Sequence, residues 1–506
     1  MHWTMVWFLS FGLWALFQTI EGMALCSETN VGSYLAKDEV HPNVVWRWIF
    51  DKNFELGLNW VAHGKKGIYD PSNTPGARSS SVGVAYKETF AIFGGSGYGE
   101  LEWLDKIFGF KNDYGKLNDV WVFNLSSWEW VWVSGSRFVD QLGICGAKGS
   151  YDASNTPGAR SSSVGIAHNG SFVIFGGYGY SGSTLGCWFR SHKSYSGTLN
   201  DVWELKLGSW EWRWISGSKL ANQVSAYGAK RIWNSSYGPG GRYSSVGNSH
   251  NGTIIIFGGY GHGKSWALND VWEFDLNSWN WRWTGGSKIS DQLGIYGPKG
   301  TYDPLNAPGA RGSMVGAVHR STLVIFGGFG YSESDIGRLN DVWEFDLNSL
   351  EWRWTGGSKL VDQFGDYGTK GVYGLSNSPG ARISSVGAVL CGNLVIFGGS
   401  GYNEFERGIL NDVWEFDLSS WEWKWSSGSR IPLENSVHWM RGVYDRSNSP
   451  SVRKEALGIE WNGTLLIFGG WGHMDIWRVE SYSLTPGGID RHLNEVWQFE
   501  IRNCQT

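Results

Sequence analysis

Three histidines occupy equivalent positions in three copies of a repeated sequence, and histidine is a common metal ligand. They are His168, His250 and His319. Each lies at a turn in a different copy, so we expect the three imidazoles to lie far apart at the surface. The sequence therefore predicts no metal site. No P-loop or GxGxxG motif follows an apolar run, so no nucleotide is expected either, and we predict no cofactor.

An arginine recurs once in each of six copies, always 16 residues before the first glycine of a Phe-Gly-Gly motif. These residues are Arg78, Arg160, Arg242, Arg311, Arg382 and Arg453. An acidic residue follows in Leu-Asn-Asp-Val-Trp, at Asp119, Asp201, Asp270, Asp341 and Asp412, with Glu495 in the sixth copy. Because both repeat in every copy, we expect structural roles: the arginine bonds a loop or a neighbouring repeat, and the aspartate anchors a turn.

Four short β-type runs position these residues in each copy, and we name them A to D. Run A follows the arginine, run B leads into Phe-Gly-Gly, run C contains Val-Trp, and run D is the Trp-x-Trp-x-Trp segment, as in Trp210, Trp212 and Trp214. Short polar turns join A to B and C to D, which predicts antiparallel strands. Four such strands repeated six times predict an all-β fold, a six-bladed β-propeller with the tryptophans packed between blades.

The sixth copy has no run D, but an equivalent segment lies near the start of the chain. Trp46-Arg47-Trp48-Ile49 matches Trp212-Arg213-Trp214-Ile215 residue for residue. We therefore expect a closing strand over 44–50 to complete the last blade, so that the ring spans 44–503 and leaves no open edge. The repeats begin near residues 78, 160, 242, 311, 382 and 453.

The first residues have features typical of an export signal. Met5 to Phe17 is an uncharged apolar run too short to span a bilayer, and a small-x-small site follows at Gly22-Met23-Ala24. We expect a signal peptide over 1–24, a lead segment over 25–43 and a secreted protein; an uncleaved signal anchor is the alternative. Five sequons are glycosylation candidates in that setting: Asn124, Asn169, Asn234, Asn251 and Asn462.

The five cysteines suggest disulfides in a secreted chain. Cys26 and Cys504 flank the two termini that the ring brings together, so they form one candidate pair. The preferred second pair is Cys145 with Cys187, which would pin a long loop of the second copy. Cys391 is then left over, which could equally mean that this pairing is wrong.

The composition limits the possible partners. With 506 residues, 41% hydrophobic content and a net charge of -5, the chain can bury a large core and has no lysine-arginine run that would favour nucleic acid. The sequence beyond the signal contains no membrane-spanning stretch.

The B–C connection varies most in length. From the first glycine to the acidic residue it takes 25, 25, 12, 14, 14 and 26 residues in copies one to six, so the long versions are neighbours around a closed ring. The B–C and D–A connections leave from one side, the loop face; the A–B and C–D turns form the turn face. Loops that vary on a rigid scaffold commonly carry recognition, and Tyr, Trp and Arg dominate interfaces. The binding candidates are Tyr98, Trp103, Phe108, Tyr114, Tyr180, Trp188, Arg190, His192, Trp471, His473, Trp477 and Arg478. The alternative is that these side chains pack the loops onto the ring.

The arginine, the paired glycines, Leu-Asn-Asp-Val-Trp and the tryptophan run resemble kelch repeats, as in galactose-oxidase-like propellers and attractin-type extracellular proteins. The resemblance covers about residues 44–501, although the unit here is longer than the ordinary kelch repeat. It implies that the residue after each arginine lines the channel mouth: Ser79, Ser161, Tyr243 and Lys454, with Gly312 and Ile383 in the remaining copies.

The resemblance also brings enzymatic activities to consider. A radical-copper oxidase of this kind uses a Tyr-His dipeptide that is absent here, and it has seven blades, so that activity is disfavoured. We expect a secreted binding or scaffold module that recognises a protein or glycoprotein through the long loops, and catalysis is not expected. The alternative is a carbohydrate-binding or carbohydrate-active protein, oxidase-like or epimerase-like, that uses the channel mouth.

Overall fold

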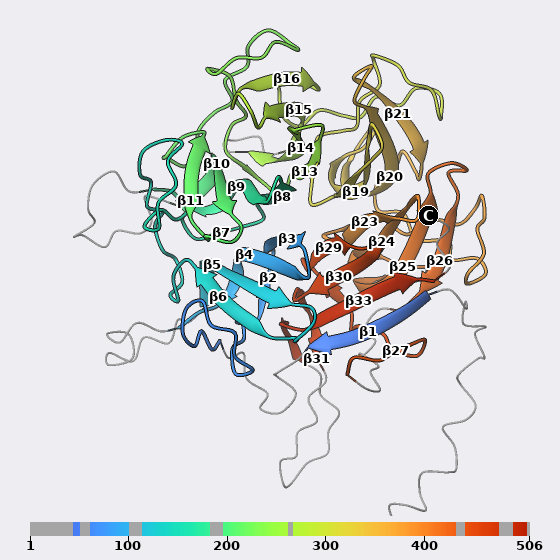
Figure 1. The fold of residues 1–506 in the computed structure, drawn as a ribbon. Coiled ribbons are helices and arrows are strands. Elements are labelled where there is room, and N and C mark those ends of the chain that lie inside the picture. Colours follow the sequence, from blue (N-terminus) through green and yellow to red (C-terminus); the bar gives the residue numbers. More distant parts are fainter. Residues whose placement is uncertain are drawn as a thin grey trace, which may run out of the picture. The chain divides into compact units, whose positions relative to one another are not determined.

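The computed structural model describes residues 44–50, 61–100, 114–182, 196–261, 267–431, 441–474 and 489–502. All of them belong to one compact unit, His41–Thr506. Every regular element in these ranges is a β-strand (Figure 1). The predicted signal peptide over 1–24 and lead segment over 25–43 lie outside the described residues. No helix in the described part is long and apolar enough to cross a membrane.

Strands A to D of each copy form one antiparallel sheet, which is a blade. The A strands are β3 (Val82–Tyr86), β8 (Val164–His168), β13 (Val246–His250), β18 (Val315–His319), β23 (Val386–Leu390) and β29 (Leu457–Trp461). The B strands are β4 (Thr89–Tyr98), β9 (Ser171–Tyr180), β14 (Thr253–Gly261), β19 (Thr322–Tyr331), β24 (Asn393–Tyr402) and β30 (Thr464–Phe468).

The C strands are β5 (Tyr114–Asn124), β10 (Ser196–Lys206), β15 (Ala267–Asp275), β20 (Ile336–Asp346), β25 (Arg407–Asp417) and β33 (Val496–Ile501). The D strands are β6 (Trp130–Ser134), β11 (Trp212–Ser216), β16 (Trp281–Gly285), β21 (Glu351–Gly356), β26 (Trp423–Ser427) and β1 (Val44–Phe50). Consecutive A strands contact each other around the whole cycle, from β3 through β8, β13, β18, β23 and β29 back to β3. The six sheets therefore form a closed six-bladed propeller, as predicted.

The predicted closing strand is confirmed at its predicted bounds. β1 pairs with β33 antiparallel, with Trp46 opposite Phe499 and Arg47 opposite Gln498 (Figure 1, blue strand beside red). The Arg47 guanidinium also donates to the Gln498 side chain. β27 (Tyr444–Asp445) pairs with the outer edge of β1 and covers part of it.

A two-residue strand that begins with the repeated arginine pairs with the end of strand B in five blades. These strands are β2 (Arg78–Ser79), β7 (Arg160–Ser161), β12 (Arg242–Tyr243), β17 (Arg311–Gly312) and β22 (Arg382–Ile383). In blade six the equivalent strand, β28 (Arg453–Lys454), joins β31 (Trp471–Met474) and β32 (Ile489–His492) in a separate small sheet.

The core consists of six apolar clusters, each shared by two neighbouring blades. The cluster between blades one and two joins Phe93 and Val120 to Trp203 and Trp212, and Trp210 and Trp214 pack against it. The predicted packing of the tryptophans between blades is confirmed. Trp210, however, precedes strand β11 and has a positive φ of 60°, so it belongs to the turn.

The glycine that is the second residue of each A strand lets the inner strands approach closely. A Cβ at Gly247 would lie 2.1 Å from Val164 Cγ1 of the preceding blade, and Gly316 has the same relation to Val246, at 2.2 Å. The repeated Val-Gly pair therefore serves the packing of six strands around a narrow channel.

Candidate functional site

The repeated arginine and acidic residue form a buried ion pair within each blade. Arg78 Nη1 and Nη2 donate to the two carboxylate oxygens of Asp119 at 2.7 and 2.8 Å, and Arg78 Nε donates to the Gly76 carbonyl. Trp121 Nε1 donates to the same carboxylate at 2.7 Å. The arginine does bond its D–A connection as predicted. The prediction that the aspartate anchors a turn is wrong, because its carboxylate accepts from the arginine and the indole.

Burial and ion pairing act in opposite directions on the pKa of Asp119. Burial by itself raises the pKa of Asp119, but the Arg78 guanidinium, together with the neighbouring His63, outweighs it and holds the pKa below its usual range. The Arg78–Asp119 pair is therefore charged at neutral pH, and each of the six pairs helps to fix where the two-residue strand meets its blade.

The second residue after each arginine lines the channel at the loop face. Its backbone amide donates to the carbonyl of the equivalent residue in the preceding blade, and the bonds close a complete ring. The six bonds are Ser80 to Glu455, Ser162 to Ser80, Ser244 to Ser162, Ser313 to Ser244, Ser384 to Ser313 and Glu455 to Ser384, at 2.8–3.0 Å. All six residues have a positive φ, from 54° to 58°. The ring is rigid because every backbone group in it has a partner.

A cavity of about 360 Å³ lies at this ring. Its lining combines serine hydroxyls, two tyrosines, one lysine and one glutamate: Ser80, Ser96, Lys116, Ser161, Ser162, Tyr178, Tyr243, Ser244, Ser313, Ser384 and Glu455. The charged groups come from blades one and six, while blades three to five contribute serines and a tyrosine. The charged side chains therefore lie on one side of the channel mouth.

Lys116 is held in this cavity by two hydroxyls. Its Nζ donates to Ser96 Oγ at 2.6 Å and to Ser161 Oγ at 2.7 Å, and it lies 5.8 Å from the centre of the Tyr178 ring. Burial lowers the pKa of Lys116, and Glu455 and Asp140 act in the opposite direction. Glu455 Oε2 accepts from Ser79 Oγ and Ser80 Oγ, both at 3.0 Å.

An aromatic group from blades one and six borders the charged side of the mouth. Tyr114 lies 5.4 Å from Tyr98 and 5.1 Å from His492, measured between ring centres. The Tyr114 hydroxyl is 3.4 Å from His492 Nε2. Burial lowers the pKa of His492, Glu455 opposes this, and Lys116 and Lys454 lower it further. Lys454 Nζ lies 4.8 Å over the Trp471 ring.

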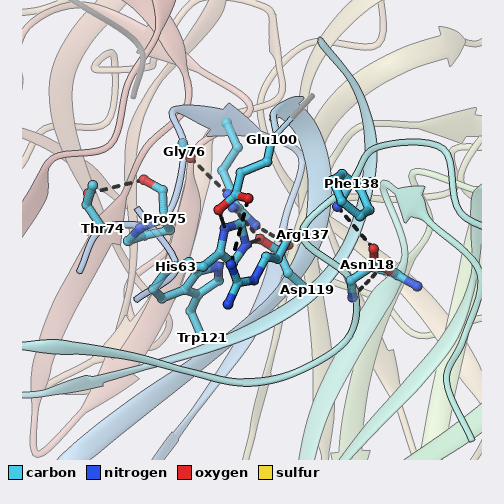
Figure 2. Close-up of polar contacts among 12 residues, drawn as sticks. His63, Thr74, Pro75, Gly76, Glu100, Asn118, Asp119, Trp121, Arg137 and Phe138 are labelled. Carbon is cyan, nitrogen blue, oxygen red and sulfur yellow. Dashed lines mark hydrogen bonds and ion pairs between the residues drawn. The ribbon is translucent and has the colours of Figure 1, made fainter. Parts of the chain in front are cut away.

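A second polar cluster lies in blade one, where Glu100 follows strand β4 (Figure 2). His63 is 1% exposed, and its Nδ1 lies 3.0 Å from Glu100 Oε1. Its Nε2 is 3.8 Å from Asp119 Oδ2. The ring lies between Trp121 and Trp132, with centres 5.0 and 5.1 Å away. Arg137 Nη1 is 3.9 Å from Glu100 Oε2. His63 therefore lies between the buried Arg78–Asp119 pair and the partly exposed Arg137–Glu100 pair.

The predicted channel residues are divided between lining and support. Ser161 and Tyr243 line the cavity, whereas Ser79 bonds Glu455 and Lys454 covers Trp471. Across all six blades the lining position is the second residue after the arginine. Among the predicted loop residues, Tyr98, Tyr114 and Trp471 lie at the mouth, His473 lies in β31, and Tyr180 ends β9. Trp103, Phe108, Trp188, Arg190, His192, Trp477 and Arg478 lie outside the described residues.

Sequence reasoning missed Lys116, Glu455 and His492 as members of one site. Two signals could have found them. Glu455 replaces the serine of the five other copies, and Lys116 and His492 share the variable position before the repeated leucine of strand C. His168, His250 and His319 end β8, β13 and β18 in separate blades. Within the described ranges, no three His, Cys, Asp or Glu side chains group as a metal site.

The preferred cysteine pairing is wrong. Cys145 is a free thiol, whose pKa is raised to about 11 by burial and by Asp201, so it forms no bond with Cys187. Cys391, which we expected to be left over, is disulfide-bonded to a partner outside the described residues. Cys26, Cys187 and Cys504 also lie outside them.

The comparisons with known proteins agree with the repeat. The family described as the KLHDC2/KLHL20/DRC7 Kelch-repeats domain matches residues 235–361, within blades three and four. The solved structure titled "Structure of YjhT" is similar at 14% identity and a TM-score of 0.45, over 84% of this chain and 95% of that chain. None of the curated proteins matches the chain. The chain forms a six-bladed β-propeller closed by an N-terminal outer strand, and part of it, residues 235–361, matches a kelch-repeat family.

Proposed function

We propose that this propeller is a binding module that recognises a protein or glycoprotein partner at the charged side of the channel mouth, over blades six, one and two. One observation carries the proposal. The charged residues of the mouth, Lys116 and Glu455, and the adjacent His492 lie on blades one and six, two of the three neighbouring blades with long B–C connections. Charged and aromatic side chains beside long loops on a rigid ring give directional recognition.

The distribution of side chains over the two faces supports the choice of the loop face. The large hydrophobic side chains that are exposed all lie in D–A or B–C connections or at the strand ends beside them; examples are Ile144, Leu220, Ile289, Leu360 and Phe405. Among the described residues, no exposed large hydrophobic side chain lies on an A–B or C–D turn. The loop side of the ring therefore offers a partner more exposed apolar side chains than the turn face does.

The positions of the sequons also favour the loop face as the binding surface. Asn169, Asn251 and Asn462 are exposed on A–B turns, and Asn124 ends strand β5 at a C–D turn, so four of the five sequons lie on the turn face. Asn234 lies on the outer side of blade three, where it bridges to Trp281. Glycans at these positions would leave the loop face free. An extracellular location and glycosylation are part of the proposal.

A second candidate function is the binding or conversion of a small polar ligand in the channel mouth. The convergence of Lys116, Glu455 and nearby His492 on one cavity favours it, because these side chains can bind and exchange protons with a hydroxylated ligand. Binding of such a ligand by the wild-type chain, in the absence of any macromolecular partner, would favour this second function over the first.

Substitutions that introduce the residue found at the equivalent position of another blade test the first proposal. Lys116→Thr introduces the residue of blade two, and Glu455→Ser that of the five other blades. We expect a partner captured by the full chain from extracellular material to be lost by both variants and kept by Glu333→Ser, a change at a B–C connection in blade four. Equal capture by all four proteins would overturn the proposed site.

A further inference from the structure

One position in the D–A connection contacts the buried acidic residue in several blades, and its residue type differs among them. In blades three, four and five it is Tyr227, Tyr296 or Tyr367, whose hydroxyl donates to Asp270, Asp341 or Asp412 at 2.6 Å. In blade one it is His63. A tyrosine hydroxyl keeps its proton through the physiological range, whereas an imidazole exchanges one there.

Blades four and five show what blade one would look like without a histidine. Glu333 and Glu404 occupy the position of Glu100, and they pair with Lys359 at 3.7 Å and Arg430 at 3.4 Å. The Tyr–Asp bonds of those blades are separate from these pairs. In blade one Glu100 has the equivalent partner, Arg137, and is also bonded by His63. His63 thus contacts both carboxylates, whereas in blades four and five the tyrosine at this position bonds only the aspartate.

The number of protons on His63 decides how many carboxylates it can hold. A carboxylate accepts only, so Nδ1 carries the hydrogen directed at Glu100. A neutral imidazole then has no hydrogen on Nε2, which faces Asp119 at 3.8 Å and has no hydrogen-bond partner. The imidazolium carries a hydrogen on both nitrogens and a positive charge between two negative ones.

The charged groups around His63 are two carboxylates and three cations. Glu100 and Asp119 face the ring directly. Arg78 is paired with Asp119, and Arg137 lies near the outer oxygen of Glu100. Lys66 Nζ lies 5.1 Å over the ring of Trp132, which packs on His63. Two carboxylates face the imidazole, while the three cations contact other groups.

We propose that His63 is a pH-sensitive positioning residue: when protonated it ties Glu100 to the Arg78–Asp119 pair, and when neutral it can hold only one of the two carboxylates. Glu100 follows Tyr98 by two residues, and Tyr98 packs on Tyr114 and His492 at the mouth. Protonation therefore steadies the end of strand β4 beside the recognition site. The effect of His63 on recognition rests on the proposed function, whereas its pH-dependent contact with Glu100 and Asp119 does not.

Local hydrogen exchange in the full chain tests the tie. The Glu100 amide donates to the Arg137 carbonyl at 2.8 Å, so its exchange reports how firmly this segment is held. After correction for the intrinsic pH dependence of exchange, we expect severalfold greater protection of the Glu100 amide at about pH 5.5 than at about pH 8. No partner is needed, so failure of the proposed function would not affect the result.

Two variants separate the tie from general stability. His63→Tyr copies blades four and five, keeps a donor for Asp119 and should give protection that no longer depends on pH. Glu100→Gln keeps an acceptor for Nδ1 but removes one negative charge, so the pH response should shrink; it also serves if His63→Tyr does not fold. A wild-type chain without a pH response, or His63→Tyr with an unchanged one, would refute the proposal.

Discussion

Gly94, in the middle of strand β4, lies against the backbone carbonyl of Arg160 in the next blade, where a Cβ would be 2.7 Å from the oxygen. The same relation recurs around the ring and ends with Gly469 against the Arg78 carbonyl, at 2.6 Å. Because these glycines also have positive φ, 63° at both ends of the series, no other residue fits without strain. The paired glycines therefore set the distance between blades.

Replacing Gly94 should cost more than replacing a glycine with the same backbone conformation in open space. Gly170 has φ of 75° and no atom near its would-be Cβ, so Gly170→Ala should lower the free energy of unfolding by about 1–2 kcal/mol. Gly94→Ala adds the clash with Arg160, about 1–3 kcal/mol more. Urea denaturation measures both, and equal losses would contradict the contact as the cause.

Breaking a buried Arg–Asp pair should destabilise the protein strongly. Arg311→Met leaves Asp341 charged and buried, which costs about 3–5 kcal/mol. The control is Lys359→Met, because the Lys359 and Glu333 side chains are 35% and 53% exposed and their pair should be worth about 1 kcal/mol or less. Thermal or urea unfolding of the two variants gives the comparison. Similar losses would show that burial is not what distinguishes the pairs.

Stability should fall in acid because of the paired carboxylates. Burial alone raises the pKa of Asp270, but Arg242 and the hydrogen bonds from Tyr227 and Trp272 outweigh it, so the folded pKa lies below the unfolded one. This contribution is present above the unfolded pKa of about 3.9 and is lost as the pH falls below it. The free energy of unfolding should decline below about pH 4, and Asp270→Asn should flatten the decline. If the free energy of unfolding of Asp270→Asn depends on pH as it does in the wild type, Asp270 is not a source of the acid sensitivity.

Blade two offers a stabilising substitution. Cys145 stands where Tyr227, Tyr296 and Tyr367 each donate a hydrogen bond to the buried aspartate of their blade. Cys145→Tyr should give Asp201 the same bond and raise the free energy of unfolding by about 0.5–1.5 kcal/mol. Cys145→Phe controls for added volume. If both variants change stability equally, the hydroxyl does not reach Asp201.

The blades and their closure could be predicted because both rest on local patterns. Alternation along strand D and the match of 46–49 to 212–215 each involve a few adjacent residues, and the register of Trp46 opposite Phe499 follows from them. The partner of Asp119 could not be found in this way. Arg78 precedes it by 41 positions and meets it only once strands β2 and β5 occupy the same blade.

The candidate site was predicted less completely for a related reason. The loop face and the blades were expected, and Ser161 and Tyr243 do line the cavity, but the position that lines it in all six blades is the second residue after the arginine. Backbone direction decides this: Ser80 and Glu455 have positive φ, which turns their backbone groups toward the neighbouring blades. A period-two pattern holds no information about such a turn. Cys145 failed as a disulfide candidate because its surroundings are set by the blade core.

The pairing of β1 with β33 makes the order of synthesis part of the assembly of this protein. Strand β1 emerges from the ribosome before any blade, yet its partner, residues 496–501, is made only after the five blades that lie between them in the sequence. Blades one to five can form as they are translated, since each pairs strands close in sequence, while β1 must wait with an unpaired edge. Circularly permuted chains that begin at strand β3 and carry β1 after β33 should therefore reach the native ring with less aggregation.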